Sequence, residues 1–127
     1  MISYVTLGSN DRVKAKAFFD AALAPLGLIA SYADDEMVGY GPRGGETQLW
    51  VVQPFDGLDA AAGNGNMLAL AASTRAQVDE VHAAALAAGG RDEGRPGVRE
   101  QYGPNFYAAY FRSPEGHKLA IVCRTPA

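Results

Sequence analysis

Hydrophobic and polar residues alternate along the first segment of the chain, "MISYVTLG". The period of two predicts a strand with Tyr4 on one face and Val5 and Leu7 on the other. The next segment, "SNDRVKAKAFFDAALAPLG", spaces apolar residues by three or four positions, which predicts a helix that ends near its proline and glycine. Three short β-type runs follow, "LIASYAD", "EMVGYGP" and "ETQLWVVQ". The turn residues between them predict three consecutive antiparallel strands.

The predicted first helix has two apolar stripes. An aliphatic stripe recurs at helical spacing and predicts one buried face: Val13, Ala17, Ala21 and Ala24. Phe19 and Leu23 form an i,i+4 pair on another side of the helix. This second pair could pack within the chain or form an interface between protomers.

The second half of the chain repeats the pattern of the first. A β-type run, "NMLALAA", precedes the helical run "STRAQVDEVHAAALAAGG", in which Thr74 and Gln77 have capping-box spacing. The β-type runs "FYAAYFR" and "HKLAIVC" come later. A shift of 63 positions superposes strand on strand and helix on helix, and it places Tyr4 on Met67. At an offset of 70, "LWVV" aligns with "LAIV", which pairs Trp50 with Ala120.

This repeat predicts an α+β fold in which a βαβββ unit is used twice. We expect a single domain over residues 1–127, with module one at about 1–55 and module two at about 66–125. The Gly/Ala/Asn-rich segment at about 56–65 is the expected linker.

Composition and charge exclude several classes of function. The formal net charge of −3 and the scattered basic residues provide no basic surface for nucleic acid. No apolar run approaches the roughly 18 residues of a membrane span. The single cysteine, Cys123, cannot form an internal disulfide. These features predict a cytoplasmic protein that binds neither nucleic acid nor membrane.

The two βαβββ units and the terminal segment "FYAAYFRSPEGHKLAIVC" resemble the glyoxalase/bleomycin-resistance/extradiol-dioxygenase superfamily, also called vicinal oxygen chelate proteins. The most specific part is "FRSPEGHKL", which is similar to the family's strand-turn-strand signature. Here Ser113 replaces the first acidic residue of that signature. The resemblance covers essentially the whole chain. It implies that the modules form an open, barrel-like mixed sheet around a cavity, with the helices outside.

The resemblance also implies where a divalent metal would bind in the family, on the first and last strands of each module. The four matched positions hold Tyr4, Trp50, Met67 and Ala120, and none is His, Glu or Gln. Gln48, two residues before Trp50, would supply one neutral oxygen donor if the register shifted by two. We therefore expect no cofactor, and a divalent metal is the less favoured alternative.

Aromatic residues are the main candidates for lining the cavity. Tyr107 and Tyr110 fall on opposite faces of one strand, so one of them should face the cavity. The segment "RDEGRPGVREQYGPNFY" is predicted to be a loop at the cavity mouth. His82 is predicted to pack between helix and sheet, and His117 to lie at a solvated strand end or at the cavity rim. The complete set of candidate cavity residues is Tyr4, Gln48, Trp50, Met67, Tyr102, Tyr107, Tyr110 and Ala120.

Three functions are compatible with these residues. The favoured hypothesis is a metal-independent protein that binds or sequesters a small molecule in an aromatic-lined cavity. The alternative is a superfamily enzyme, a glyoxalase-type lyase or isomerase or a dioxygenase, with an unusual or metal-free site. A structural or regulatory domain acting through its surface is the third. The resemblance also implies a homodimer.

Overall fold

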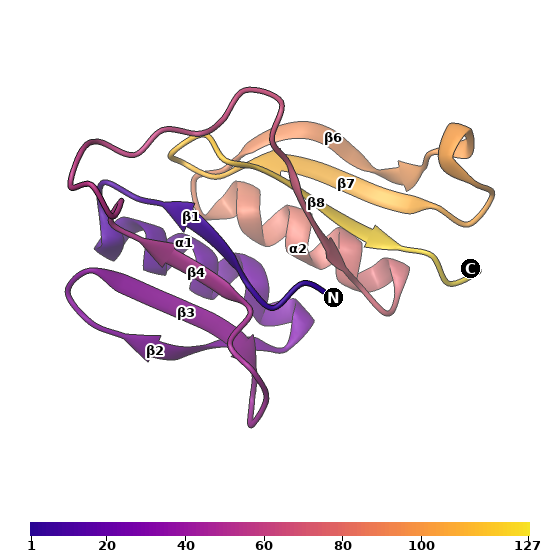
Figure 1. Cartoon of the computed structure of the whole chain (residues 1–127). Coiled ribbons are helices and arrows are strands. Elements are labelled where there is room, and N and C mark those ends of the chain that lie inside the picture. Colours follow the sequence, from indigo (N-terminus) through magenta and orange to yellow (C-terminus); the bar gives the residue numbers. More distant parts are fainter.

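The computed structural model describes residues 1–127 as two four-stranded sheets and two helices (Figure 1). Module one consists of β1 (Val5–Gly8), α1 (Arg12–Leu23), the 3₁₀ turn η1 (Ala24–Leu26), β2 (Leu28–Ala33), β3 (Met37–Pro42) and β4 (Leu49–Val52). Module two consists of β5 (Leu68–Ala71), α2 (Arg75–Ala87), β6 (Arg91–Val98), the 3₁₀ turn η2 (Glu100–Tyr102), β7 (Tyr107–Arg112) and β8 (Lys118–Cys123). The predicted α+β fold of two βαβββ units is confirmed.

The two sheets have the same topology. The strand orders are β1-β4-β3-β2 and β5-β8-β7-β6, and the two sheets are not closed into one barrel. In each module the first strand pairs in parallel with the last, and the remaining pairs are antiparallel. Thr6 lies opposite Trp50, and the equivalent pair in module two is Ala69 and Ala120. The internal repeat seen in the sequence is therefore a repeat of strand register.

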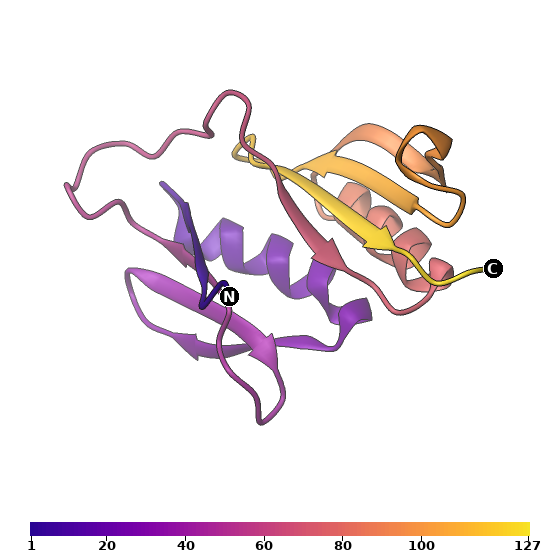
Figure 2. The ribbon, with the colours of Figure 1, turned by 45° about the vertical axis from the view of Figure 1, so that its right-hand side comes forward.

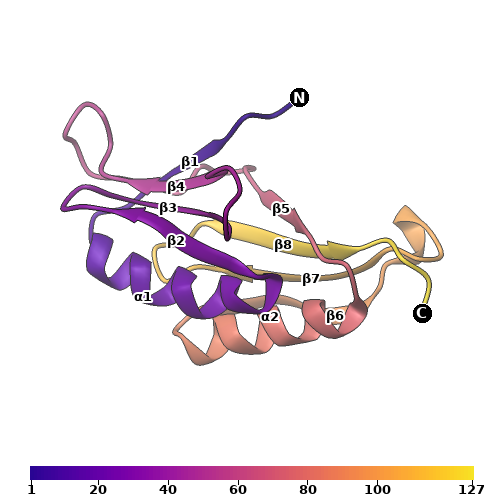
Figure 3. The same cartoon turned by 90° about the horizontal axis from the view of Figure 1, so that it is seen from below.

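Both helices lie on the same side of the two sheets, and the opposite side is open (Figure 3). Along each strand, alternate residues point toward the helices, as the period of two requires. Val51 and Ile121, on the last strands of the two modules, are buried in one hydrophobic cluster. Phe18 of α1 contacts Phe111 of β7, with ring centroids 6.2 Å apart. The two modules consequently share a single core beneath two separate open faces.

Helix α1 buries a different face from the one that its aliphatic stripe predicts. Val13 is 68% exposed, and Ala17, Ala21 and Ala24 are exposed as well. The buried face instead carries Phe18, Phe19 and Leu23 together with Ala15 and Ala22. The prediction for the stripe is wrong because large aromatic side chains exclude more apolar surface from water than alanines do. Phe19 and Leu23 therefore pack within the chain.

Helix α2 follows the prediction closely. Thr74 and Gln77 form the capping box at its start, and the helix buries Val78 and Val81. His82 is buried, and its Nε2 donates to Asp92 Oδ1 at 3.0 Å. The backbone N–H of Gly94 and then His82 stabilise the Asp92 carboxylate and lower its pKa. The predicted packing role of His82 is confirmed.

The segment predicted as a loop at the cavity mouth contains the edge strand β6, followed by the turn η2. Its register against β7 shifts between Asp92 and Gly94 and again between Gly94 and Gly97. Bulges, charged side chains and a proline are typical of edge strands. The same features interrupt the alternation of apolar and polar residues that predicts a strand. The loop prediction is therefore wrong over 91–98.

Polar contacts join the turn between β7 and β8 to the start of α1, far apart in the sequence. Ser9 Oγ donates to Glu115 Oε1 at 2.6 Å, and the backbone N–H of Asn10 donates to Oε2 at 2.7 Å. His117 Nε2 donates to the carbonyl of Gly8 at 2.7 Å, so His117 is not merely a solvated strand end. The linker at about 56–65 also passes near the start of α1, and Figure 2 shows it running from β4 over to β5.

No helix is long and apolar enough to span a membrane.

Replacing Glu115 with Ala should destabilise the protein through its contact with module one. Ser9 Oγ and the Asn10 N–H lose a charged acceptor, so we expect the free energy of unfolding to fall by about 1 to 2 kcal/mol. Urea denaturation followed by circular dichroism measures the change. Glu80→Ala, at an exposed position of α2, is the matched control. Equal stability of the two variants would contradict a role for Glu115 in joining the modules.

Candidate functional site

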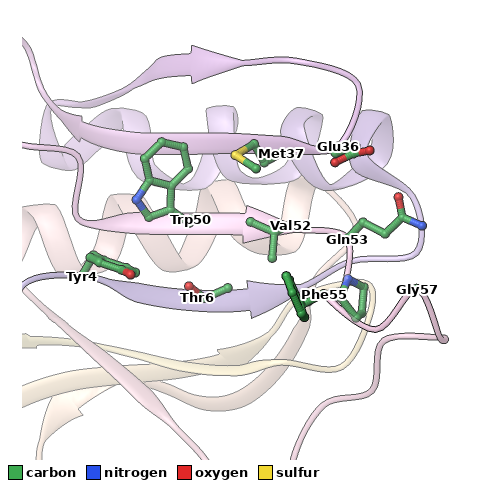
Figure 4. Close-up of a pocket in the computed structure, with 11 residues that line it drawn as sticks. Tyr4, Thr6, Glu36, Met37, Trp50, Val52, Gln53, Phe55 and Gly57 are labelled. Atoms are coloured by element: carbon green, nitrogen blue, oxygen red, sulfur yellow. The ribbon is translucent and has the colours of Figure 1, made fainter.

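The open face of module one is hollowed into a groove of about 1170 Å³. Side chains that point away from the core rise from β1 and β4 on the same side of the sheet (Figure 4). Apolar surface dominates the lining, and the hydrophobic residues that supply it are Tyr4, Met37, Trp50, Val52 and Phe55. Tyr4 remains 59% exposed, so the groove is open to solvent on one side. Such a concave apolar surface is typical of small-molecule sites.

Trp50 is positioned by its neighbours on β3 and β2. Gly39 lies opposite Trp50 in the register, and a Cβ on Gly39 would come within 2.7 Å of the indole ring. Only glycine leaves room for the indole over β3. Tyr32 then meets Trp50 edge-on, with ring centroids 5.8 Å apart. This arrangement is favourable for two aromatic rings and holds the indole in place.

Asp34 organises the turn that carries Tyr32. Its Oδ1 accepts the backbone N–H groups of Glu36 at 2.8 Å and Met37 at 2.9 Å. Its Oδ2 accepts the hydroxyl of Tyr32 at 2.8 Å. These three hydrogen bonds stabilise the carboxylate and lower the pKa of Asp34. The hydrogen bond from Tyr32 to Asp34 also raises the pKa of the Tyr32 hydroxyl. Sequence reasoning found the turn but missed its link to Trp50, because an Asp in a turn has many possible partners.

One end of the groove is polar. Glu36 and Gln53 line it there, and both are exposed. Gly8 also lines the groove, and a Cβ at this position would come within 2.9 Å of Ala60 in the linker. Gly8 therefore allows the linker to close this end of the groove.

Module two has a separate, smaller hollow on its own open face. Its volume is about 140 Å³, and its lining includes Met67, Phe106, Tyr110, Ala120 and Val122. Ala120 is fully buried at its floor. The two hollows share no lining residue. Within one chain, the structure brings Tyr4 together with Trp50, and Met67 together with Tyr110 and Ala120.

The structure separates the two tyrosines of β7. Tyr110 lines the hollow, whereas Tyr107 packs against the core on the helix side. The Tyr107 hydroxyl donates to Asp79 Oδ1 at 2.6 Å, and this contact raises the pKa of Tyr107. Of the two alternatives left open by the sequence, Tyr110 is the residue on the open face.

Two further candidates lie at the margins. Gln48 is exposed just before β4 and does not line the groove. Tyr102, in η2, is 65% exposed and meets Phe106 edge-on, with centroids 5.3 Å apart. Tyr102 thus lies next to the hollow of module two rather than within it.

The residues at the family's metal positions do not fit a divalent cation. Trp50 and Ala120 have no donor atom for a metal, and Met67 offers only a thioether. Tyr4 offers a phenol, and it lines a different hollow from Met67 and Ala120. No group of three or more His, Cys, Asp or Glu side chains is arranged to hold a metal ion.

Comparison with known proteins identifies relatives of the same fold. A glyoxalase/bleomycin resistance protein from Albidiferax ferrireducens T118 is 34% identical, with a TM-score of 0.85 over 97% of this chain and 98% of that one. A glyoxalase/bleomycin resistance protein/dioxygenase family enzyme from Burkholderia phytofirmans PsJN is 20% identical, with a TM-score of 0.73 over 98% of both chains. Lactoylglutathione lyase from Agrobacterium tumefaciens is 22% identical, with a TM-score of 0.66 over 97% of this chain and 92% of that one.

The latter two, at 20% and 22% identity, show the fold alone. No protein-family model and no curated protein matches the sequence. Fold, topology and the relative that is 34% identical show that the chain belongs to the glyoxalase/bleomycin resistance/dioxygenase superfamily.

Divalent metals should leave the stability of this protein unchanged. Because the four matched side chains offer no set of hard or borderline donors, Zn²⁺, Ni²⁺, Mn²⁺ or Fe²⁺ has no preferred site in the folded state. We expect the same Tm with each metal and with EDTA in a thermal-shift measurement. A Tm increase that saturates near one equivalent of metal would contradict this prediction and restore a metal centre.

Proposed function

We propose that this protein binds a small molecule in the groove of module one, without a divalent metal at the family's metal positions. The observation that carries the proposal is the position of Trp50. Its indole is fixed between Gly39 and Tyr32 on the wall of an open groove of about 1170 Å³. A rigid aromatic wall of this kind contributes apolar contact area with little loss of side-chain entropy.

The lining supports a ligand with a planar apolar body. Tyr4, Trp50 and Phe55 offer aromatic contacts, and Met37 offers an adaptable thioether. The polar end of the groove, at Glu36 and Gln53, suits a hydrogen-bond donor on that ligand.

A glyoxalase-type or dioxygenase reaction has less support. The isomerase reaction needs a Lewis acid or equivalent electrophile together with a base that reaches the substrate carbon. The matched positions carry Tyr, Trp, Met and Ala, which supply neither. Binding or sequestration is therefore the function that these side chains favour.

Trp50 is the only tryptophan of the chain, so the intrinsic tryptophan fluorescence of the protein comes from the groove. We expect planar aromatic fragments that enter the groove to change its fluorescence. For a fragment found in this way, Trp50→Ala should weaken binding about tenfold or more, because a large apolar contact is lost. Isothermal titration calorimetry measures the affinity of both proteins.

Tyr107→Phe is the control for this measurement, because Tyr107 lies on the helix side of the sheet. Its affinity for the fragment should equal that of the wild type. If Trp50→Ala bound the fragment as tightly as the wild type, the groove would not be the binding site.

A homodimer is the second part of the proposal. Large apolar side chains are exposed along the open side of module one and in the linker: Ile2, Tyr4, Phe55 and Leu58. Isolated apolar side chains are normal on a monomer, but a group beside a groove is typical of an interface. A second copy covering this side would also shield the groove from water.

Light scattering coupled to size exclusion should give a mass close to twice 13.4 kDa. Tyr4→Asp places a charge on the proposed interface, so we expect it to shift the protein toward the monomer. Val13→Asp is the matched control, since Val13 is 68% exposed on the helix side. A monomeric wild type, or equal dissociation of both variants, would argue against this interface.

A further inference from the structure

The small hollow of module two has an apolar floor, and basic side chains lie over the aromatic residues that line it. Phe106, Tyr110, Ala120 and Val122 line a volume of about 140 Å³. Pockets for drug-sized ligands are roughly 300 to 1,000 Å³, so this hollow suits one ring or a short alkyl chain. Ala120 is fully buried and Val122 nearly so, which gives the hollow a well-packed floor.

Three cations lie over the aromatic rings of this hollow. Arg99 Cζ is 5.4 Å and Lys118 Nζ is 5.9 Å from the centroid of the Tyr110 ring. Arg124 lines the hollow, and its Cζ is 5.3 Å from the centroid of Phe106. The ion pairs of the protein are Lys16–Asp20, His82–Asp92 and Arg112–Glu93, so none of the three cations is neutralised by a carboxylate.

Backbone contacts hold Arg99 in this position. Its two terminal nitrogens donate to the carbonyls of Gly97 at 2.9 Å and Arg95 at 2.6 Å. Three of the five guanidinium N–H groups are left for another acceptor. Gly94 lies opposite Tyr110, and a Cβ there would come within 2.8 Å of the Tyr110 ring and 3.2 Å of Arg99. Glycine at this position thus allows ring and guanidinium to stack.

We propose that the hollow of module two binds a small organic anion, a monocarboxylate with an apolar ring or short chain. The apolar part would contact Phe106, Tyr110 and the floor, and the carboxylate would face Arg124, the cation that lines the hollow. Lys118 and Arg99, over the Tyr110 ring, would add to the positive potential beside it. A carboxylate forms its strongest hydrogen bonds with such donors, and an apolar surround strengthens them. Charge is distributed accordingly: the β2–β3 turn beside the groove of module one carries Asp34, Asp35 and Glu36, whereas the rim of this hollow is basic.

This inference does not rest on the function proposed for module one, because the two hollows share no residue.

Benzoate is the first probe, with benzamide as its neutral counterpart. In a ¹H–¹⁵N correlation titration, benzoate should shift the amide signals of Phe106, Tyr110 and Ala120. Benzamide should bind more weakly. The affinity for benzoate should fall as ionic strength rises, because the cations are partly exposed.

Lys118→Gln combined with Arg124→Gln should weaken benzoate binding about tenfold and leave the affinity for benzamide unchanged. These two positions are preferred to Arg99, whose backbone contacts also hold the end of β6. Arg43→Gln, in the exposed turn after β3, removes the same kind of charge far from the hollow and should have no effect.

Trp50→Ala should leave the benzoate-induced shifts of Phe106, Tyr110 and Ala120 unchanged, because Trp50 lines the groove of module one and not this hollow. The proposal is overturned if benzoate causes no shifts at these amides up to millimolar concentration. Benzamide shifting the amides of Phe106, Tyr110 and Ala120 as readily as benzoate, or Arg43→Gln weakening the benzoate shifts as much as the double variant, would overturn it as well.

Discussion

The burial of one face of each sheet against a common pair of helices determines the rest of this structure. Both helices pack on the same side, and their apolar residues join those of both sheets in a single cluster. Removing this apolar surface from water is the dominant stabilising contribution to such a fold. The helices cover only that side. The strand residues that alternate with the core-facing ones therefore form two open faces, and every candidate ligand contact lies on one of these faces.

The shared core also explains why the two modules diverge on the open side. On the core side, equivalent strand positions hold similar residues, such as Val51 and Ile121, since both must fill the same interior. On the open side, Trp50 in module one is matched by Ala120 in module two. No packing requirement of the monomer constrains that pair to be alike. The result is a wide aromatic groove on one sheet and a narrow, basic-rimmed hollow on the other.

The strands and their internal repeat could be predicted because alternation with a period of two is a strong local signal when one face is buried. The capping box of α2 was equally readable, since Thr74 and Gln77 interact across a fixed spacing. Edge strand β6 could not be predicted in this way, because its bulges, glycines and proline remove the alternation of apolar and polar residues. The buried face of α1 was misassigned because alanine is compatible with either side of a helix, and only tertiary contacts show which side Phe18 and Phe19 occupy.

The candidate site shows the same limit at the level of single residues. Alternation placed Tyr4 on one face of its strand, and the family resemblance added Trp50 to the same cavity. The choice between Tyr107 and Tyr110 stayed open, and the partners of these rings could not be predicted. Gly39 and Gly94 matter because each lies opposite an aromatic residue on a neighbouring strand, a relation that depends on register. In both modules a missing side chain on one strand makes room for a ring from the next, and that ring forms a wall of the hollow. The chemistry of the two sites therefore depends on these glycines as much as on the aromatic residues themselves.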